Sequence, residues 1–220
     1  MKFQTSRREA LALGLGAAAL AALPARAELE GKGYALGDVV IGDPEAKVTV
    51  IEYASFTCPH CASFHRVSWP ELKANYIDTG KAKFILREIF FDQFGLYATM
   101  IARCGGTDIY PQMVTAFLDR QQDWYAAHVG AFNATKDPLP MLDEMKKIGR
   151  LGGLSNERMD SCLYDQELLD RLVADFQEKA GADEVRSTPT FFVNGERIVG
   201  AVPAAELGAA IDKALAAAGG

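Results

Sequence analysis

Long apolar segments and internal repeats are absent from this 220-residue sequence, which contains only four cysteines and three histidines. Its longest apolar run spans residues 11–23, whereas a membrane-crossing helix needs about 20 such residues. Basic residues are in the minority, because 23 Lys and Arg stand against 29 Asp and Glu and give a net charge of −6. This balance argues against a nucleic-acid partner. With 49% hydrophobic and 24% charged residues, the chain is neither disordered nor collagen-like.

The first 27 residues carry the pattern of an export signal. Basic residues precede the apolar run at 11–23, and the small-residue sequence Ala-Arg-Ala follows at 25–27. We therefore expect a cleavable signal peptide over 1–27, cut after Ala27, rather than an uncleaved hydrophobic anchor. Residues 6–11, Ser-Arg-Arg-Glu-Ala-Leu, resemble the twin-arginine export motif, although an alanine replaces the usual aromatic residue. The pattern leaves open whether export follows the twin-arginine or the Sec route.

Hydrophobic periodicity predicts strands and helices with one long helical stretch. Val48–Tyr53 is β-branched and almost continuously apolar, which is typical of a buried central strand. Helical spacing follows from Pro59 to about Asp78, and Pro70 is expected to kink this helix. Asn194 and Gly195 form a strong two-residue hairpin signal. The other predicted elements are a strand at Lys83–Phe91, helices between Phe94 and Gly181, strands at Thr190–Val193 and Arg197–Val199, and a helix from Pro203 to about Ala218.

This order of elements indicates one α/β domain with an all-helical insertion. Residues 28–37 are polar and glycine-bearing, and we interpret them as a loose segment rather than as a dimerisation domain. Four large side chains fall within helical patterns, and we interpret them as core or surface residues rather than as ligands. They are His65, His128, Trp69 and Trp124.

The four cysteines allow three disulfide pairings. Cys58 and Cys61 are three positions apart in Cys-Pro-His-Cys, which favours pairing with each other and leaves Cys104 to pair with Cys162. After export, these thiols would face an oxidising compartment. A Cys-x-x-Cys pair at the start of a helix also has a chemical purpose, because the free N–H groups and partial positive charge there stabilise the thiolate of Cys58. Stabilising the reduced form in this way makes the pair a strong oxidant.

Two residues inside the Cys-x-x-Cys loop bear on this chemistry. Pro59 suits the first turn of the helix, and the imidazole of His60 can donate a hydrogen bond or a positive charge to the Cys58 thiolate and lower its pKa. An alternative is a metal-binding module in which Cys58, His60 and Cys61 hold zinc or copper. A structural zinc site generally has two close ligand pairs, whereas the other two cysteines stand alone. We therefore expect neither a metal nor another cofactor.

The sequence Glu-Tyr-Ala-Ser-Phe-Thr-Cys-Pro-His-Cys at 52–61, with Thr-Pro-Thr-Phe-Phe-Val-Asn-Gly at 188–195, resembles the DsbA family. Members of this family are bacterial periplasmic thiol:disulfide oxidoreductases with a thioredoxin fold that a helical domain interrupts. The resemblance implies a thioredoxin-like domain formed by 28–93 and 182–220, an inserted helical domain at 94–181, and a periplasmic location.

The resemblance also implies roles for residues outside the Cys-x-x-Cys motif. Pro189 matches the family's cis-proline opposite the cysteine pair, and Thr188 then offers backbone groups for strand-like pairing with a substrate. Glu52 matches a buried acid that exchanges protons with Cys61. The alternative for Glu52 is a strand face open to water.

The function that the resemblance implies is donation of the Cys58–Cys61 disulfide to cysteine pairs of unfolded exported proteins, through a mixed disulfide at Cys58. A DsbB-like membrane quinone reductase would reoxidise the pair, and we expect the protein to be a monomer. Thr188 departs from the valine of the family's best-known oxidase, which leaves open an isomerase or reductase of the same fold. Cys104 and Cys162 match a second, structural disulfide that some members carry, with two buried free thiols as the alternative.

Overall fold

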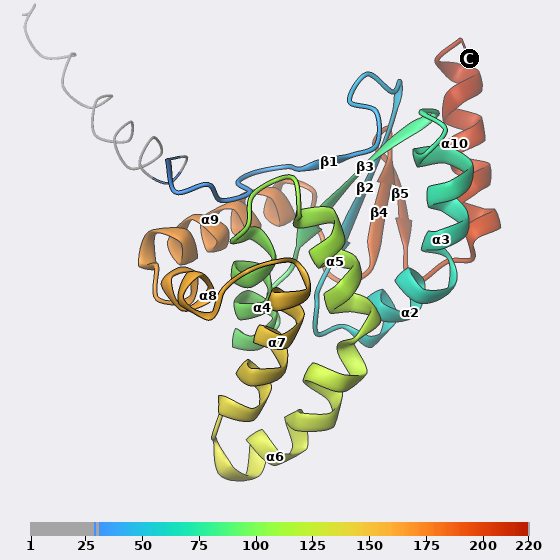
Figure 1. Cartoon of the computed structure of the whole chain (residues 1–220). Helices are drawn as coiled ribbons and strands as arrows, with labels where there is room; N and C mark the ends of the chain where they lie inside the picture. Colours follow the sequence, from blue (N-terminus) through green and yellow to red (C-terminus); the bar gives the residue numbers. More distant parts are fainter. Residues whose placement is uncertain (1–28, 30, 220) are drawn as a thin grey trace, which may run out of the picture.

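A five-stranded mixed β-sheet lies at the centre of the computed structural model, with helices on both of its faces (Figure 1). The structure describes residue 29 and residues 31–219, so the predicted signal peptide at 1–27 lies outside the described residues. The strand order is β1 (Val40–Ile41), β3 (Ala82–Glu88), β2 (Val48–Ala54), β4 (Thr190–Val193) and β5 (Glu196–Val199). No helix in this described part of the chain is long and apolar enough to cross a membrane.

Strand β2 is the middle strand of the sheet. It pairs in parallel with β3 and antiparallel with β4, while β1 and β5 form antiparallel edges. Because a central strand is covered on both faces, nearly every position favours an apolar side chain. Glu52 is the charged residue of this strand, and it lies opposite Leu86 and Phe191 and is completely buried. Side chains alternate between the two faces, so Glu52 shares its face with Val50 and not with Tyr53.

The helix predicted after the cysteine pair is present but divided. It consists of α2 (Pro59–Val67), α3 (Trp69–Leu72) and a π-helical turn η1 (Lys73–Ile77). The break falls at Ser68, two residues before Pro70. Pro70 has no N–H to donate, and its ring crowds the carbonyl four residues earlier, in the last turn of α2. The predicted kink is therefore confirmed.

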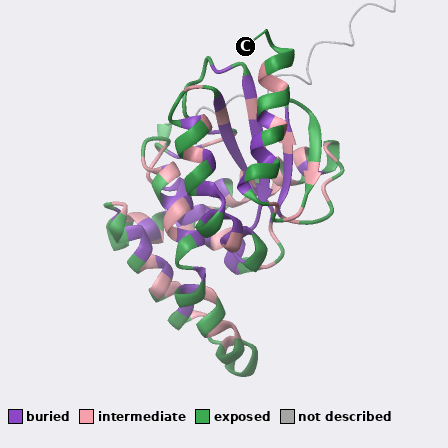
Figure 2. Cartoon of the chain, turned by 90° about the vertical axis from the view of Figure 1, so that its right-hand side faces the viewer, coloured by how far each residue is buried: buried purple, intermediate pink, exposed green. Residues whose placement is uncertain are grey.

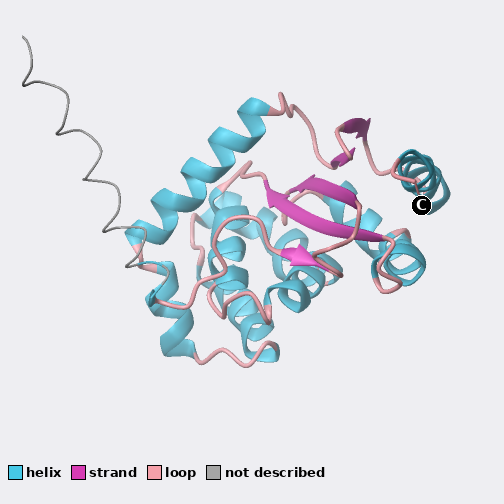
Figure 3. Ribbon diagram, turned by 90° about the horizontal axis from the view of Figure 1, so that it is seen from above, coloured by secondary structure: helices cyan, strands magenta, loops and turns pink. Residues whose placement is uncertain are grey.

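Only helices lie between β3 and β4, as the sequence predicts for this described stretch. Figures 1 and 3 show most of them on one side of the sheet, with α10 (Ala204–Ala217) on the other. They are α4 (Gln93–Arg103), α5 (Tyr110–Asp119), the π-helical η2 (Gln122–Ala126), α6 (Ala127–Thr135), α7 (Leu139–Leu151), α8 (Asn156–Leu163) and α9 (Gln166–Ala182). The fold is thus thioredoxin-like with a helical insertion, in agreement with the predicted fold class.

The predicted hairpin is also confirmed. Strands β4 and β5 are antiparallel and are joined by Asn194 and Gly195, whose φ angles are 46° and 90°. A type I′ turn requires positive φ at both central residues, and Asn-Gly is the pair that tolerates this at the lowest steric cost.

One main hydrophobic core joins the sheet to the helical insertion. Its buried side chains come from β2 and β3 as well as from α4, α5 and α7. Figure 2 shows the strands as mostly buried, with exposed residues along the outer faces of the helices. The insertion therefore packs into the same core that supports the cysteine pair.

The segment before β1 is packed against the protein, which corrects the expectation of a loose segment. Tyr34 is 8% exposed and Ala35 is fully buried. The guanidinium of Arg103 donates hydrogen bonds to the carbonyl oxygens of Ala35 (2.6 Å) and Gly37 (2.9 Å). The polar, glycine-bearing composition of this segment indicated that it would be solvated. Its backbone carbonyls are instead the hydrogen-bond acceptors of the buried guanidinium of Arg103. Composition carries no information on such a distant partner.

Candidate active site

The two cysteines of the Cys-x-x-Cys motif lie at the start of α2, at the end of the loop that follows β2. Cys58 is the N-cap residue in an extended conformation, and Pro59 occupies the first helical position, where its missing N–H costs nothing. Both cysteines are free thiols. Cys58 is 7% exposed and Cys61 is completely buried, so a second molecule can approach only the sulfur of Cys58.

The pKa of the Cys58 thiol is lowered from its ordinary 9.0 to about 5. The largest cause is a hydrogen bond from the thiol of Cys61, and partial burial opposes it. The side chain of Thr188 and the backbone N–H groups of Cys61 and His60 lower the pKa further. These N–H groups belong to the first turn of α2, which has no other use for them. Near neutral pH, Cys58 is therefore a thiolate.

Cys61 has the opposite character. Burial raises the pKa of its thiol far above the ordinary value, and the hydrogen bond with Cys58 and the charge of Glu52 raise it further. Cys61 thus remains protonated while Cys58 is ionised. This difference assigns the nucleophilic sulfur to Cys58 and gives Cys61 a proton that must leave before it can react.

A cis peptide bond between Thr188 and Pro189 faces the cysteine pair. The backbone carbonyl of Thr188 lies 3.5 Å from the sulfur of Cys58. The hydroxyl oxygen of Thr188 is buried and has no hydrogen-bond partner among the described residues. It is therefore available to donate to the Cys58 sulfur when that sulfur is ionised, which accounts for its effect on the pKa of Cys58.

Replacing Thr188 with Val should raise the pKa of Cys58 by about one unit, since a hydrogen bond to a charged group contributes about 1.5 to 3 kcal/mol and part of this is recovered from solvent. The ultraviolet absorbance of the thiolate, followed against pH, measures this shift. Thr190→Val in the adjoining strand is the matched control, because its hydroxyl donates to Ser187 and not to sulfur. An unchanged midpoint in Thr188→Val would contradict the assignment of the hydroxyl.

Glu52 of β2 lies beneath the cysteine pair and is paired with a histidine. Its Oε2 atom is 2.7 Å from Nε2 of His65, and the two side chains are 0% and 1% exposed. The sequence analysis interpreted His65 only as a core or surface residue. Its position four residues after Cys61 is the signal for a second role, because residues i and i+4 share one face of a helix.

His60 is not one of these buried side chains. It is exposed, and its hydrogen bond to the Cys58 sulfur comes from the backbone N–H rather than from the imidazole. Among residues 29 and 31–219, no group of three or more His, Cys, Asp or Glu side chains is arranged to hold a metal ion. The metal-binding alternative therefore has no geometric support in that part of the chain.

Gln121, at the end of the α5 region, is a site residue that the sequence analysis missed. Its side-chain amide donates hydrogen bonds to the carbonyl oxygens of Phe56 and Cys58, each at 2.8 Å. Gln121 is 5% exposed, so these bonds are shielded from water. The helical insertion thereby holds the loop that presents Cys58, an arrangement that no local sequence pattern indicates.

Replacing Gln121 with Met should lower the free energy of unfolding by about 1 to 3 kcal/mol, because it leaves buried carbonyl groups without a donor. It should also raise the pKa of Cys58, since the first turn of α2 loses its anchor. Chemical denaturation and thiolate absorbance measure the two effects. The control is Gln122→Met, because Gln122 is exposed; equal behaviour of the two variants would contradict the anchoring role.

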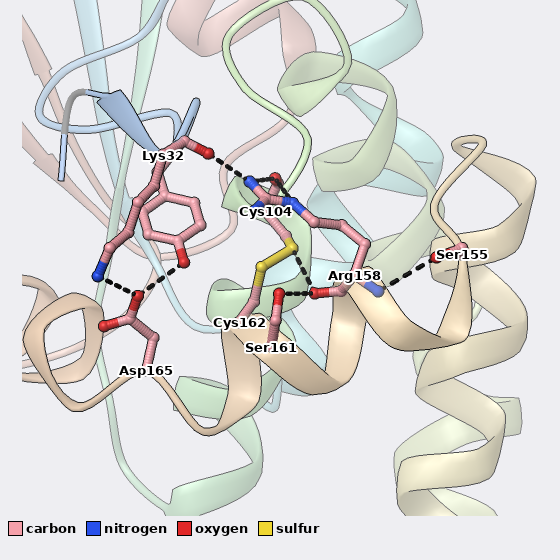
Figure 4. The surroundings of a disulfide bond; sticks show 8 residues. Lys32, Cys104, Ser155, Arg158, Ser161, Cys162 and Asp165 are labelled. Atoms are coloured by element: carbon pink, nitrogen blue, oxygen red, sulfur yellow. Dashed lines mark hydrogen bonds and ion pairs between the residues drawn. A yellow bond between two sulfur atoms is a disulfide. The ribbon is translucent and has the colours of Figure 1, made fainter. Parts of the chain in front are cut away.

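The other two cysteines form a disulfide bond away from this site. Cys104, at the end of α4, is bonded to Cys162 in α8, and both are completely buried. Figure 4 shows the guanidinium of Arg158 next to this bond, where it donates to the carbonyl oxygens of Cys104 (2.8 Å) and Lys32 (2.7 Å). On the other side, Lys32 pairs with Asp165 at 2.9 Å. The disulfide thus joins α4 to α8, while Arg158 and the Lys32–Asp165 pair hold the N-terminal segment beside it.

A nucleophilic cysteine at a helix N-terminus, a buried second cysteine and a facing cis-proline on a central sheet define a thioredoxin-fold dithiol protein. A model of the family described as thioredoxin matches residues 35–213. The chain is 36% identical over 179 residues to a putative protein-disulfide oxidoreductase of Rickettsia conorii, which covers 81% of this chain and 60% of the relative. The chain therefore belongs to the thioredoxin family, within its DsbA-like group.

Solved structures agree with this assignment. Wolbachia pipientis α-DsbA1 superposes with a TM-score of 0.73 at 29% sequence identity, covering 83% of this chain and 92% of that one. Protein-disulfide isomerase from Novosphingobium aromaticivorans has a TM-score of 0.70 at 25% identity, covering 82% and 98%. The chain spans about 60% of the length of the Rickettsia relatives.

Proposed function

We propose that this protein is an exported thiol:disulfide oxidoreductase that donates the Cys58–Cys61 disulfide to cysteine pairs of other exported proteins. The observation that carries the proposal is the contrast between the two sulfurs: the pKa of Cys58 is lowered to about 5, and that of Cys61 is raised. A disulfide is a strong oxidant when its reduced form is stabilised, and ionised Cys58 supplies this stabilisation.

The reaction begins when a substrate thiolate attacks the sulfur of Cys58 in the oxidised protein. The Cys58–Cys61 bond breaks, a mixed disulfide forms at Cys58, and Cys61 leaves as a thiolate that takes up a proton. We assign this proton to Glu52, the buried carboxyl group beneath the pair. The second substrate thiolate then attacks the substrate sulfur of the mixed disulfide. Oxidised substrate departs, and Cys58 remains as the thiolate that α2 and Thr188 stabilise.

The cis-proline loop is proposed to hold the substrate during this exchange. Thr188 and Pro189 lie beside the exposed edge of Cys58, where the backbone of Thr188 can pair with an extended peptide. His60 is two residues after Cys58, and its side chain is exposed. We propose that it adds positive charge near the thiolate of Cys58 when it is protonated.

We further propose a periplasmic location and reoxidation by a DsbB-like membrane quinone reductase, with the protein acting as a monomer. The predicted signal peptide at 1–27 and the likeness to DsbA proteins support the location. The division into a thioredoxin-like part at 28–93 and 182–220 and a helical domain at 94–181 is likewise a proposal about how the chain folds.

Disulfide isomerisation is the second candidate function. The structure from Novosphingobium that superposes on this chain is named a protein-disulfide isomerase. Both functions use a mixed disulfide at Cys58. An isomerase, however, must begin as the reduced dithiol, attack an incorrect disulfide of the substrate, and be released as the dithiol again. The redox equilibrium of the pair separates the two.

The deciding experiment is the equilibrium of the Cys58–Cys61 pair with glutathione, combined with oxidation of a reduced peptide that carries two cysteines. We expect a pair more oxidising than glutathione. Cys58→Ser should abolish peptide oxidation, and Cys61→Ser should abolish it as well, because neither variant can form the Cys58–Cys61 disulfide that is donated. A pair more reducing than glutathione would overturn disulfide donation as the main activity. Tightly held stoichiometric metal in the purified reduced protein would favour the metal-binding alternative instead.

The reduced protein should become more stable as the pH rises from 5 toward 9. The pKa of Cys58 is about 5 in the folded protein, against an ordinary value of 9.0. The ionised thiol therefore stabilises the folded state fully above pH 9, and this stabilisation is lost as the pH falls to about 5. At pH 7 the contribution is about 2 to 3 kcal/mol.

Urea denaturation of the reduced protein at several pH values measures this effect. The comparison is with reduced Cys58→Ser, which retains every other titrating group. The difference between the two proteins should increase with pH over this interval. A difference that is constant with pH would show that Cys58 is not ionised in the folded protein.

A further inference from the structure

The buried pair of Glu52 and His65 has features that a purely structural pair does not need. The inference drawn from it deepens the proposed function, because it concerns the proton that Cys61 exchanges in the same reaction. Cys61 and His65 are one helical turn apart on the buried face of α2, and β2 places Glu52 against that face. The charge of Glu52 acts directly on Cys61.

The ring contacts of His65 and the strand partners of Glu52 are apolar side chains among the described residues. The ring of His65 packs against Trp69 of α3 (5.7 Å between ring centroids) and Phe84 of β3 (6.4 Å). The strands beside Glu52 place Leu86 and Phe191 opposite it. The ionisable neighbour of this pair among the described residues is Cys61, which lies on α2, the same helix as His65. Charge and protons in this pocket therefore belong to three side chains.

The two oxygens of Glu52 are used differently. Oε2 is 2.7 Å from Nε2 of His65, whereas Oε1 is buried and has no hydrogen-bond partner among the described residues. A nitrogen and an oxygen at this distance share a hydrogen, so one oxygen is committed to the histidine. Leaving the other buried oxygen without a donor costs free energy that folding alone would avoid. Oxygen Oε1 is thus an open position for a proton on Glu52, and the other unpartnered atom of the pair is Nδ1 of His65.

We propose that His65 is a positioning residue of the redox site: its Nε2–H holds Oε2 of Glu52, so that Oε1 exchanges the proton of Cys61. During substrate oxidation, the Cys58–Cys61 bond breaks and the Cys61 sulfur leaves with the electron pair. The proton on Oε1 moves to that sulfur, and Glu52 becomes a carboxylate that the N–H of His65 stabilises.

Reoxidation reverses this transfer. The thiolate of Cys58 first attacks one sulfur of a disulfide oxidant, whose own disulfide bond breaks and releases one thiolate, so that a mixed disulfide forms at Cys58. Cys61 then gives its proton to Oε1 of Glu52, and its thiolate attacks the sulfur of Cys58. The bond between Cys58 and the oxidant breaks, and the reduced oxidant leaves as a thiolate. His65 touches neither sulfur in this scheme and acts only through Glu52.

The reaction of the reduced protein with oxidised glutathione separates the two steps. Formation of the mixed disulfide at Cys58 is measured in a Cys61→Ser background, because no Cys61 thiol is present there to break the mixed disulfide. Its decay is measured in the full protein by acid quenching and mass spectrometry. Formation depends on Cys58 alone, whereas decay requires Cys61 to lose its proton. An effect on decay without an effect on formation therefore reports on the proton acceptor.

We expect His65→Phe, which fills the aromatic pocket but has no N–H, to slow the decay about tenfold at pH 7 and to leave formation within about twofold, given that a positioned acid or base contributes roughly 100-fold or more. In this variant the decay rate should rise more steeply with pH, because solvent hydroxide replaces the positioned acceptor. His65→Gln, whose amide N–H can donate to Oε2, should restore most of the rate. Trp69→Phe is the packing control and should change neither step.

Three results would overturn the role of His65. They are a normal decay rate in folded His65→Phe, equal slowing of formation and decay, or a His65→Gln variant as slow as His65→Phe. If His65→Phe does not fold, His65→Met supplies the same comparison. Melting temperatures establish that each variant is folded.

Variants of Glu52 separate this inference from the proposed function. Glu52→Gln should slow decay about 100-fold, and adding His65→Phe to it should cause no further loss, because His65 acts through Glu52. A normal decay rate in Glu52→Gln would overturn the assignment of Glu52 and the inference together. Slow decay in Glu52→Gln with normal decay in His65→Phe would overturn the inference alone.

Discussion

Replacing Arg103 with Met is expected to lower the free energy of unfolding by about 3 to 5 kcal/mol, because it leaves a buried carboxylate without its partner. Arg103 of α4 and Glu88 of β3 are 4% and 8% exposed. Their contact is bidentate, with Nε to Oε1 at 2.8 Å and Nη2 to Oε2 at 2.7 Å. The hydroxyl of Tyr110 donates to the same carboxylate at 2.7 Å.

The same guanidinium holds the chain before β1 through the carbonyl oxygens of Ala35 and Gly37. Arg103→Met therefore releases three parts of the protein at once: the end of β3, the helical insertion and the N-terminal segment. Burial opposes the charged form of Arg103, but the carboxylate charge of Glu88 outweighs it and raises the pKa of Arg103 in the folded state. Its charge is consequently retained throughout the pH range in which the fold is stable.

Urea denaturation measures this effect, and Arg150→Met is the matched control. Arg150 is an exposed residue of α7, so its replacement should change stability by no more than about 0.5 kcal/mol. Adding Glu88→Gln to Arg103→Met should recover part of the loss, because the carboxylate charge is then removed as well. Similar stabilities for Arg103→Met and Arg150→Met would contradict the buried-pair argument.

Removing the second disulfide is expected to have the other large effect. The bond between Cys104 and Cys162 closes a sequence separation of 58 residues. In the chain-entropy model, opening such a loop lowers the free energy of unfolding by about 4 kcal/mol. The double variant Cys104→Ala and Cys162→Ala should therefore unfold at a much lower urea concentration than the parent.

This comparison is best made in a Cys58→Ser and Cys61→Ser background, so that only one disulfide can form. Adding a reductant to the parent should reproduce most of the loss, and adding it to the double variant should have no effect. Equal stability of the parent and the double variant would contradict the prediction. The bond joins α4 to α8, away from Cys58. A second comparison therefore keeps Cys58 and Cys61 and measures their equilibrium with glutathione with and without the Cys104–Cys162 bond. This tests whether that bond contributes only to stability.

Much of the fold could be predicted because its signals are local. The apolar run at Val48–Tyr53, the Asn-Gly turn and the helical periodicity after Phe94 each depend on residues near one another in the sequence. Strand β1 was missed because two residues, Val40 and Ile41, are too few to show a period. Strand β3 ends at Glu88 rather than at the predicted Phe91, because apolar composition continues beyond the last residue that pairs with β2.

The candidate site divides in the same way. Cys58, Cys61 and Pro59 are adjacent in sequence, so their chemistry follows from the Cys-x-x-Cys spacing and the helix that it begins. Gln121 lies 63 residues after Cys58, and no pattern around it distinguishes it from a surface glutamine. Only packing of the insertion against α2 makes it a donor to the active-site loop.

Sequence alone was sufficient to place the reactive sulfur and to propose its chemistry, since helix N-terminal N–H groups act on a residue next to them in the chain. Tertiary structure alone decided which sulfur is shielded, which carbonyls Arg103 and Gln121 hold, and which oxygen of Glu52 remains open. Those properties depend on contacts between β2, α2 and the helical insertion. A carboxylate becomes a poised proton acceptor only where folding removes water and supplies one donor for its two oxygens.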